Sequence, residues 1–226
     1  MTTKQWLWTI AFGLLISTGG CIVQDKIMTL TINPDGSAEM TVLRSNIRST
    51  EEGQKGESEI ADYRAAFNGQ TEDELRMIRQ SGARVESAVW LRQRVPLANA
   101  VHAIIPNSEA LEKLLSIPSG DGPPLVKSKF TTSQSQRRVS FQVTMQPDQL
   151  PPATDPQTAA SEMQIKRASE ISELRLAVTG GKITEARGFT VASDKHSALL
   201  DVATVMSLVR AGNGNAELFL QWEVSK

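Results

Sequence analysis

Apolar and polar residues alternate along much of the chain, which is the pattern of half-buried β-strands. Residues 25–33 and 38–42 alternate in this way, and the turn-forming Pro34-Asp35-Gly36 lies between them. This arrangement predicts a β-hairpin near the start of the folded part. The same alternation predicts further strands at residues 84–95, 98–105, 126–132, 138–145, 174–178, 182–186 and 216–224. The strands at residues 174–178 and 182–186, joined by Gly180-Gly181, are expected to form a second hairpin.

A second set of segments has apolar residues at the spacing of an amphipathic helix. It predicts helices at residues 60–67, 71–80, 155–169 and 202–210, and a short helix from Ser108 that ends before Pro118. Ser108 and Asp201 are expected to cap their helices, and Thr71 and Glu74 stand in the positions of a capping box. Residues 49–58, which are polar, are expected to form a loop.

Strands in adjacent pairs, accompanied by a smaller number of helices, indicate an α+β fold. We expect a predominantly antiparallel sheet built from hairpins, with four or five helices packed on it. Residues 21–226 are expected to form a single exported domain. Residues 147–156 contain four prolines and are the candidate for an internal boundary or a long surface loop.

The amino-terminal segment is unlike the rest of the chain. Residues 6–16 read WLWTIAFGLLI, an apolar run interrupted only by Thr9 and Gly13. Its length is that of a signal-peptide core, whereas a helix that crosses a bilayer takes roughly 20 apolar residues. Small residues follow from Ser17 to Gly20, as a signal peptidase requires. We therefore expect residues 1–20 to be a signal peptide.

The stretch STGGC, residues 17–21, resembles a bacterial lipobox and differs from it at Thr18, where leucine is common. The resemblance implies that a diacylglyceryl group is attached to Cys21 and that the mature chain is residues 21–226. Ile22 follows where an aspartate would favour the inner membrane, which implies the outer membrane, facing the periplasm. Two other interpretations stay open: an uncleaved amino-terminal transmembrane helix, since residues 5–24 carry no charge, and ordinary cleavage that leaves a free thiol.

The amino-acid composition mainly narrows the kinds of binding site that the chain can have. The 226 residues are 40% hydrophobic, which is enough for a folded core. The net charge is −1 and the charges are interleaved, which argues against a nucleic-acid-binding surface. With one cysteine and two histidines, a Cys/His zinc site is excluded, and no cofactor is expected.

No segment has the spacing of a catalytic motif. Residues 194–197 (DKHS) contain the residue types of a serine-hydrolase triad, but neighbours in an extended segment point to opposite faces. His102 is expected at or near the surface of its strand. Neither residues 33–36 nor residues 180–182 complete a metal-binding or phosphate-binding motif. The clustered carboxylates are expected on solvated helix faces: Glu51, Glu52, Glu57, Glu59, Glu72, Asp73 and Glu74.

Trp90 stands out in a chain with few aromatic residues. It falls on the strand face opposite Val89 and Leu91, together with arginines. It either packs under a helix or marks a contact surface for a partner.

An early hairpin follows the lipobox, and LAVTGGKITEAR precedes a terminal strand that contains a tryptophan. In this arrangement the chain resembles bacterial lipoproteins of the mycobacterial LppM type. The matched residues are Gly181, Lys182, Ile183 and Trp222, and the resemblance implies no site residue.

These observations predict a membrane-anchored bacterial lipoprotein that binds or scaffolds in the cell envelope and is not an enzyme. Its expected partners are the membrane, through the lipid anchor, and an envelope protein or lipid, but not nucleic acid. The alternative is an envelope enzyme whose catalytic carboxylates come from distant segments. A deep pocket with converging titratable groups would favour the enzyme, and an apolar groove or a flat surface would favour the binding protein.

Overall fold

The structure is a computed structural model that describes residues 22–119, 122–145 and 172–224. The expected signal peptide at residues 1–20, Cys21, the proline-rich segment 147–156 and the expected helix 155–169 lie outside the described residues. The domain prediction for residues 21–226 therefore stays a prediction.

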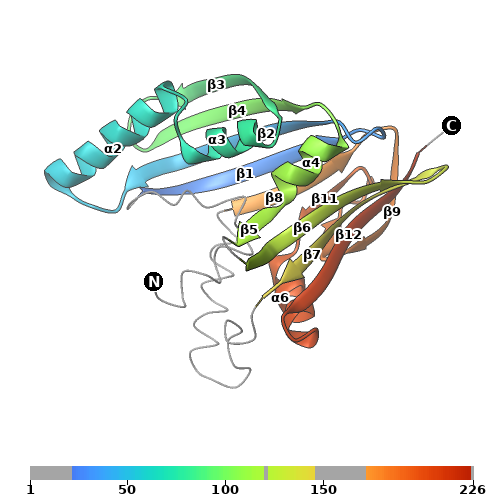
Figure 1. Cartoon of the computed structure of the whole chain (residues 1–226). Coiled ribbons are helices and arrows are strands. Elements are labelled where there is room, and N and C mark those ends of the chain that lie inside the picture. Colours follow the sequence, from blue (N-terminus) through green and yellow to red (C-terminus); the bar gives the residue numbers. More distant parts are fainter. Residues whose placement is uncertain (1–21, 120–121, 146–171, 225–226) are drawn as a thin grey trace.

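Strands dominate the described residues and form two sheets (Figure 1). The seven-stranded sheet has the order β10-β11-β8-β1-β2-β4-β3 and the five-stranded sheet the order β5-β6-β7-β12-β9. The larger sheet contains β1 (Ile22–Ile32), β2 (Ala38–Ser49), β3 (Arg84–Arg92), β4 (Leu97–Ile105), β8 (Ser172–Val178), β10 (Phe189–Val191) and β11 (Ser197–Leu200). The smaller sheet contains β5 (Ile117–Ser119), β6 (Gly122–Thr132), β7 (Gln136–Thr144), β9 (Gly181–Arg187) and β12 (Asn215–Val224).

The expected architecture, one predominantly antiparallel sheet with four or five helices packed on it, is wrong. The α+β class fits, but there are two sheets, and the larger one is mixed because β1 pairs parallel with β8. Among the described residues the helices are α2 (Gly53–Asn68), α3 (Asp73–Gln80), α4 (Ser108–Leu115) and α6 (Val202–Ala211).

The predicted first hairpin is confirmed, since β1 and β2 pair antiparallel on either side of the turn at residues 33–37. The predicted hairpin at residues 174–186 is wrong. The chain leaves the large sheet after Val178 and enters the small sheet at Gly181, so β8 pairs with β1 and β11, and β9 pairs with β12. A Cβ at Gly181 would stand 1.9 Å from the carbonyl oxygen of Glu223, so this crossing needs a glycine.

The helix ends follow the predictions in part. The Asp201 side chain accepts a hydrogen bond from the Thr204 amide at 3.0 Å and caps α6 as expected. The cap of α4 is Asn107 rather than Ser108, because the Asn107 side chain accepts from the Ala110 amide. The expected loop at residues 49–58 is wrong from Gly53 onward, where α2 begins.

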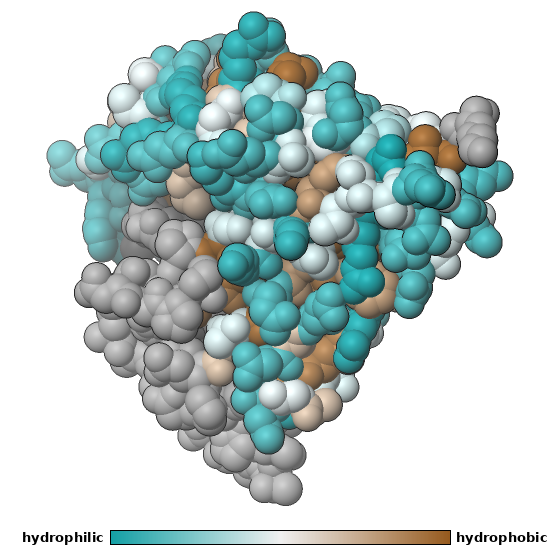
Figure 2. Space-filling view, turned by 45° about the vertical axis from the view of Figure 1, so that its right-hand side comes forward, coloured by the Kyte–Doolittle hydropathy of each residue, from teal (hydrophilic) through white to brown (hydrophobic). Residues whose placement is uncertain are grey.

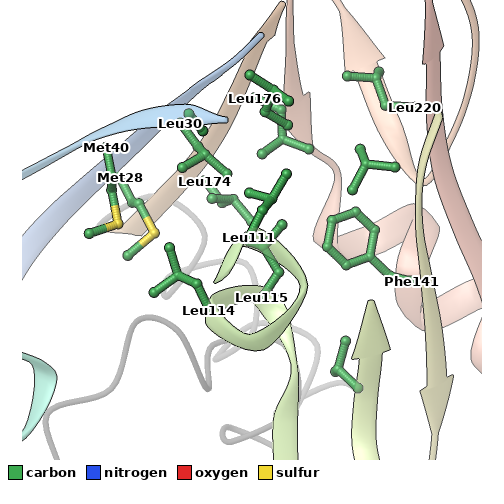
Figure 3. Packing of buried hydrophobic residues seen from close by; sticks show 14 of the residues in the cluster. Met28, Leu30, Met40, Leu111, Leu114, Leu115, Phe141, Leu174, Leu176 and Leu220 are labelled. Atoms are coloured by element: carbon green, nitrogen blue, oxygen red, sulfur yellow. The ribbon is translucent and has the colours of Figure 1, made fainter. Parts of the chain in front are cut away.

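The helix α4 lies between the two sheets and joins them (Figure 3). Leu111, Leu114 and Leu115 of this helix are buried. They lie in one apolar cluster with Met28 and Met40 of the large sheet, and the same cluster includes buried residues of the small sheet. Burial of apolar surface in this cluster stabilises the fold, by about 25 cal/mol for each Å² that is removed from water.

Candidate functional site

Four segments meet at the end of the large sheet where β1 begins. Ile22 pairs with Ser49 across β1 and β2, and Ile47 pairs with Leu97 across β2 and β4. The helix α2 starts shortly after Ser49, and the β3–β4 turn directly precedes Leu97. We call this region the amino-terminal end of the sheet.

A small apolar cluster forms the base of this end. Its buried residues are Ile47, Ile60 and Leu97, and it is separate from the main core. Ile22, Tyr63 and Trp90 are partly buried and pack against it. Because Ile22 is part of this packing, the start of the described chain is fixed against α2 and β4.

Trp90 lies between β3 and α2. Its ring centroid is 4.6 Å from that of Phe67 and 6.2 Å from that of Tyr63. Its indole nitrogen donates a hydrogen bond to Oδ1 of Asn68 at 2.8 Å. Trp90 therefore holds β3 to the helix, and its use as a contact surface for a partner stays a prediction.

A cleft of about 500 Å³ opens beside this cluster. Apolar side chains of Ile60, Ala61 and Val95 line part of it, and charged side chains line the rest. The charged and polar lining residues are Arg48, Ser49, Glu51, Glu57 and Arg64. The cleft therefore offers both charges and an apolar patch.

Two large apolar side chains are exposed where β3 ends and turns into β4. Leu91 is 58% exposed and Val95 is 56% exposed, whereas hydrophilic side chains cover most of the face seen in Figure 2. Arg92 and Arg94 between them are exposed as well. Val23, near the start of β1, is 37% exposed. We call residues 91–95 the β3–β4 tip.

A buried ion network lies between the sheet and α3. Glu74 bridges two cations, since Oε1 is 2.7 Å from Nζ of Lys26 and Oε2 is 2.5 Å from Nη2 of Arg44. The Nη1 of Arg44 donates to Oε2 of Glu72 at 3.0 Å and to Oδ1 of Asn99 at 3.3 Å. The Lys26 side chain is 2% exposed and that of Arg44 is fully buried.

Burial and charge oppose each other in this network. Burial raises the pKa of Glu74, but the adjacent Lys26 and Arg44 outweigh it, and the pKa lies below its ordinary value. Burial likewise raises the pKa of Glu72, and there it prevails over the attraction of Arg44. Burial lowers the pKa of Lys26 against the opposing charge of Glu74. The network is held together by opposite charges in mutual contact, which stabilises the position of α3 on the sheet.

The expectation that Glu72 and Glu74 lie on a solvated helix face is therefore wrong. The expected capping box is also wrong, because Glu72 occupies the N-cap position without a side-chain cap and the carboxylate of Glu74 binds Lys26 and Arg44. Asp73, between them, is exposed and pairs with Arg76.

Other sequence candidates lie elsewhere. His196 and Asp194 belong to a turn in which the Asp194 carboxylate accepts from the His196 amide at 2.9 Å. The Nε2 of His102 is 3.7 Å from a carboxylate oxygen of Glu39 on the neighbouring strand. Glu51 pairs with Lys55 within one turn of chain. Across the described ranges, no three His, Cys, Asp or Glu side chains are grouped as a metal ion would need.

Sequence reasoning missed Lys26 and Arg44, although a signal was present. Alternation through β1 and β2 places both residues on the buried face, and the two residues are cross-strand partners. Two adjacent cations on a core face require carboxylates from another element. The acidic residues Glu72 and Glu74 of the segment at residues 72–74 supply them.

Within the described residues, no helix is both long and apolar enough to cross a membrane. The chain matches no family model, and the search of curated proteins gives no match either.

A comparison with solved structures gives two matches. The folded domain of LppM from Mycobacterium tuberculosis matches with 10% identity and a TM-score of 0.39, over 94% of this chain and 95% of that chain. The Mu homology domain of Fcho1 from Danio rerio, with a bound Eps15 peptide, matches with 9% identity and a TM-score of 0.21, over 92% of this chain and 81% of that chain. Both TM-scores are low, so neither likeness carries a conclusion about the activity of this chain.

Proposed function

We propose that this protein is a bacterial lipoprotein of the cell envelope, acylated at Cys21, whose folded part acts by binding or scaffolding. The observation that carries the proposal is the position of the lipobox-like STGGC, which ends one residue before β1. Ile22 packs against the apolar cluster of Ile47, Ile60 and Leu97. An acyl group on Cys21 would therefore hold the amino-terminal end of the sheet close to the bilayer.

The proposed location is the outer membrane, facing the periplasm, because Ile22 rather than aspartate follows Cys21. An envelope protein or a lipid is the proposed partner. A nucleic-acid partner is not proposed, since the charges of the chain are balanced and interleaved.

The pairing of the two buried carboxylates supports binding over catalysis. Glu72 and Glu74 bind Arg44 and Lys26 rather than converging on an open space. The residues that line the cleft combine charges with an apolar patch, a composition suited to recognition of a mixed polar and apolar surface.

Metabolic labelling tests the anchor. The wild-type chain and the variants Cys21→Ser and Gly20→Ala are produced in a bacterial host with an alkyne-bearing fatty acid, and the membrane fraction is analysed by mass spectrometry. The wild type is expected to carry the label on a mature chain that begins at Cys21. Gly20→Ala is the matched control, since alanine is also common before a lipobox cysteine, and it is expected to be labelled.

Cys21→Ser is expected to remain unlabelled and to keep residues 1–20. An unlabelled wild type that stays in the membrane at full length would instead establish an uncleaved helix. An unlabelled, cleaved and membrane-free wild type would establish ordinary secretion, and either result would overturn the anchor. Crosslinking in intact cells, followed by identification of the attached molecules, tests the binding role.

A further inference from the structure

We propose that the β3–β4 tip, residues 91–95, is a second and non-covalent contact of this protein with an anionic phospholipid bilayer. Leu91 and Val95 enter the headgroup region, and Arg92 and Arg94 bind lipid phosphates. This inference rests on the proposed function for the membrane that lies next to Cys21.

The first argument is the exposure of the aliphatic side chains. Leu91 and Val95, at 58% and 56%, are the most exposed of the large hydrophobic side chains in the described part of the chain. Leu91 lies near the end of β3 and Val95 lies in the turn that follows, with three residues between them. Apolar groups rimmed by polar residues mark sites of protein or membrane contact. A bilayer interface removes such side chains from water without requiring a shaped pocket.

The second argument is charge. Arg92 and Arg94 are exposed, and neither makes an ion pair with any of the described residues. Residues 87–105 contain no Asp or Glu, so the tip and the strand after it carry only positive formal charge. Each arginine near an anionic lipid surface strengthens binding by about fivefold. The pair therefore favours anionic over zwitterionic lipid.

The third argument is that the tip has a firm base. Nη2 of Arg64 in α2 donates to the backbone oxygen of Gln93 at 2.6 Å. Trp90 packs on Phe67 just before the tip, and Leu97 is fully buried just after it. A turn fixed on both sides presents its apolar side chains with little further loss of conformational freedom on binding.

The fourth argument is position. Ile22 and Leu97 lie on opposite sides of β2, at Ser49 and Ile47, so two strand spacings, roughly 10 Å, separate them laterally. Cys21 directly precedes Ile22, and the β3–β4 tip lies just before Leu97. Acyl chains on Cys21 and the side chains of the tip can therefore enter the same leaflet together.

A depth measurement in vesicles tests the proposal. Single cysteines are introduced as Val95→Cys or Met77→Cys and labelled with an environment-sensitive fluorophore. Met77 is the matched control, because it is 42% exposed and lies on α3 rather than at the tip. The full chain, extracted from membranes, is reconstituted into phosphatidylethanolamine–phosphatidylglycerol vesicles that contain a nitroxide-labelled lipid.

The probe at residue 95 is expected to be quenched at least about twice as strongly as the probe at residue 77. The double variant Arg92→Gln/Arg94→Gln, or replacement of phosphatidylglycerol by phosphatidylcholine, is expected to bring the two values together. A tether alone would leave the difference between the two probes unchanged in the double variant. Equal quenching, or a difference that survives the double variant, would overturn the proposal. So would a tip that stays unquenched in vesicles and crosslinks to an envelope protein in cells.

The two proposals fail in different ways. If Cys21 is not acylated, its thiol also takes up the fluorophore and appears as a second labelled site in the mass spectrum. The difference between residues 95 and 77 is then measured in the Cys21→Ser background, which still reports whether the tip meets the bilayer.

Discussion

Replacement of Glu74 by glutamine removes the carboxylate that Lys26 and Arg44 share. Glutamine keeps the shape but turns an amide N–H₂ toward one of the two cations. The side chains of Lys26 and Arg44 are 2% and 0% exposed, so water cannot solvate the two cations in place of the lost carboxylate. Removing one partner of a buried ion pair costs about 3–5 kcal/mol. We expect Glu74→Gln to lower the free energy of unfolding by about that amount.

The assay is urea-induced unfolding followed by tryptophan fluorescence, with a linear extrapolation to water. Asp73→Asn is the matched control, because it makes the same change one residue away in an exposed pair with Arg76. The side chains of this pair are 57% and 61% exposed, and such pairs contribute about 0.5 kcal/mol or less. A cost for Glu74→Gln within about 1 kcal/mol of the control would refute the reasoning, since it would mean that water or other groups satisfy the network.

The effect of Glu74→Gln on the free energy of unfolding is expected to depend on pH. The pKa of Glu74 is lower in the folded chain than its ordinary value of 4.5, so its contribution is fully present above that value. The contribution is lost as pH falls through the folded-state pKa. The difference in stability between wild type and Glu74→Gln should therefore be constant between about pH 5 and 7 and should narrow below pH 4.5. A difference that widens in acid would contradict the direction of the shift.

Three further substitutions test the description of the fold by the same urea unfolding. Asp201→Ala removes the α6 cap and the bond from the Thr204 amide, and is expected to cost about 1 kcal/mol. Gly181→Ala places a Cβ 1.9 Å from the carbonyl oxygen of Glu223 and is expected to cost about 1–3 kcal/mol; no loss would mean that β9 and β12 separate easily. Leu111→Ala empties a fully buried position between the sheets and is expected to cost about 2–5 kcal/mol; less than 1 would mean that α4 is loosely packed.

The parts of the fold that sequence predicted are those in which local patterning decides the outcome. The hairpin at residues 25–42 and the last strand have clean alternation, and Asp201 stands directly before an apolar helical repeat. The start of α2 was missed because that helix buries little apart from Gly56, Ile60 and Phe67, so its sequence has a weak apolar repeat. The separation of β8 from β9 was missed because their partners, β1 and β12, are far away in sequence.

The buried ion network also could not be predicted from local sequence patterning. Glu72 and Glu74 resemble solvated acids when only α3 is considered, and Lys26 and Arg44 resemble ordinary strand residues when only the hairpin is considered. The interaction exists because packing places α3 over the cross-strand pair of Lys26 and Arg44. Local sequence contains the two halves, and the tertiary fold determines that they meet.

The parallel pairing of β1 with β8 also affects when the protein can fold. The strand nearest the amino terminus lies inside the large sheet, between β2 and a strand that ends at Val178. The Thr179 hydroxyl donates to Oδ1 of Asn33, a contact between residues 146 positions apart. Contacts of such long sequence separation form slowly, because a large loop must close before they stabilise anything. A chain that emerges from its amino terminus therefore cannot complete the large sheet until most of its length is available.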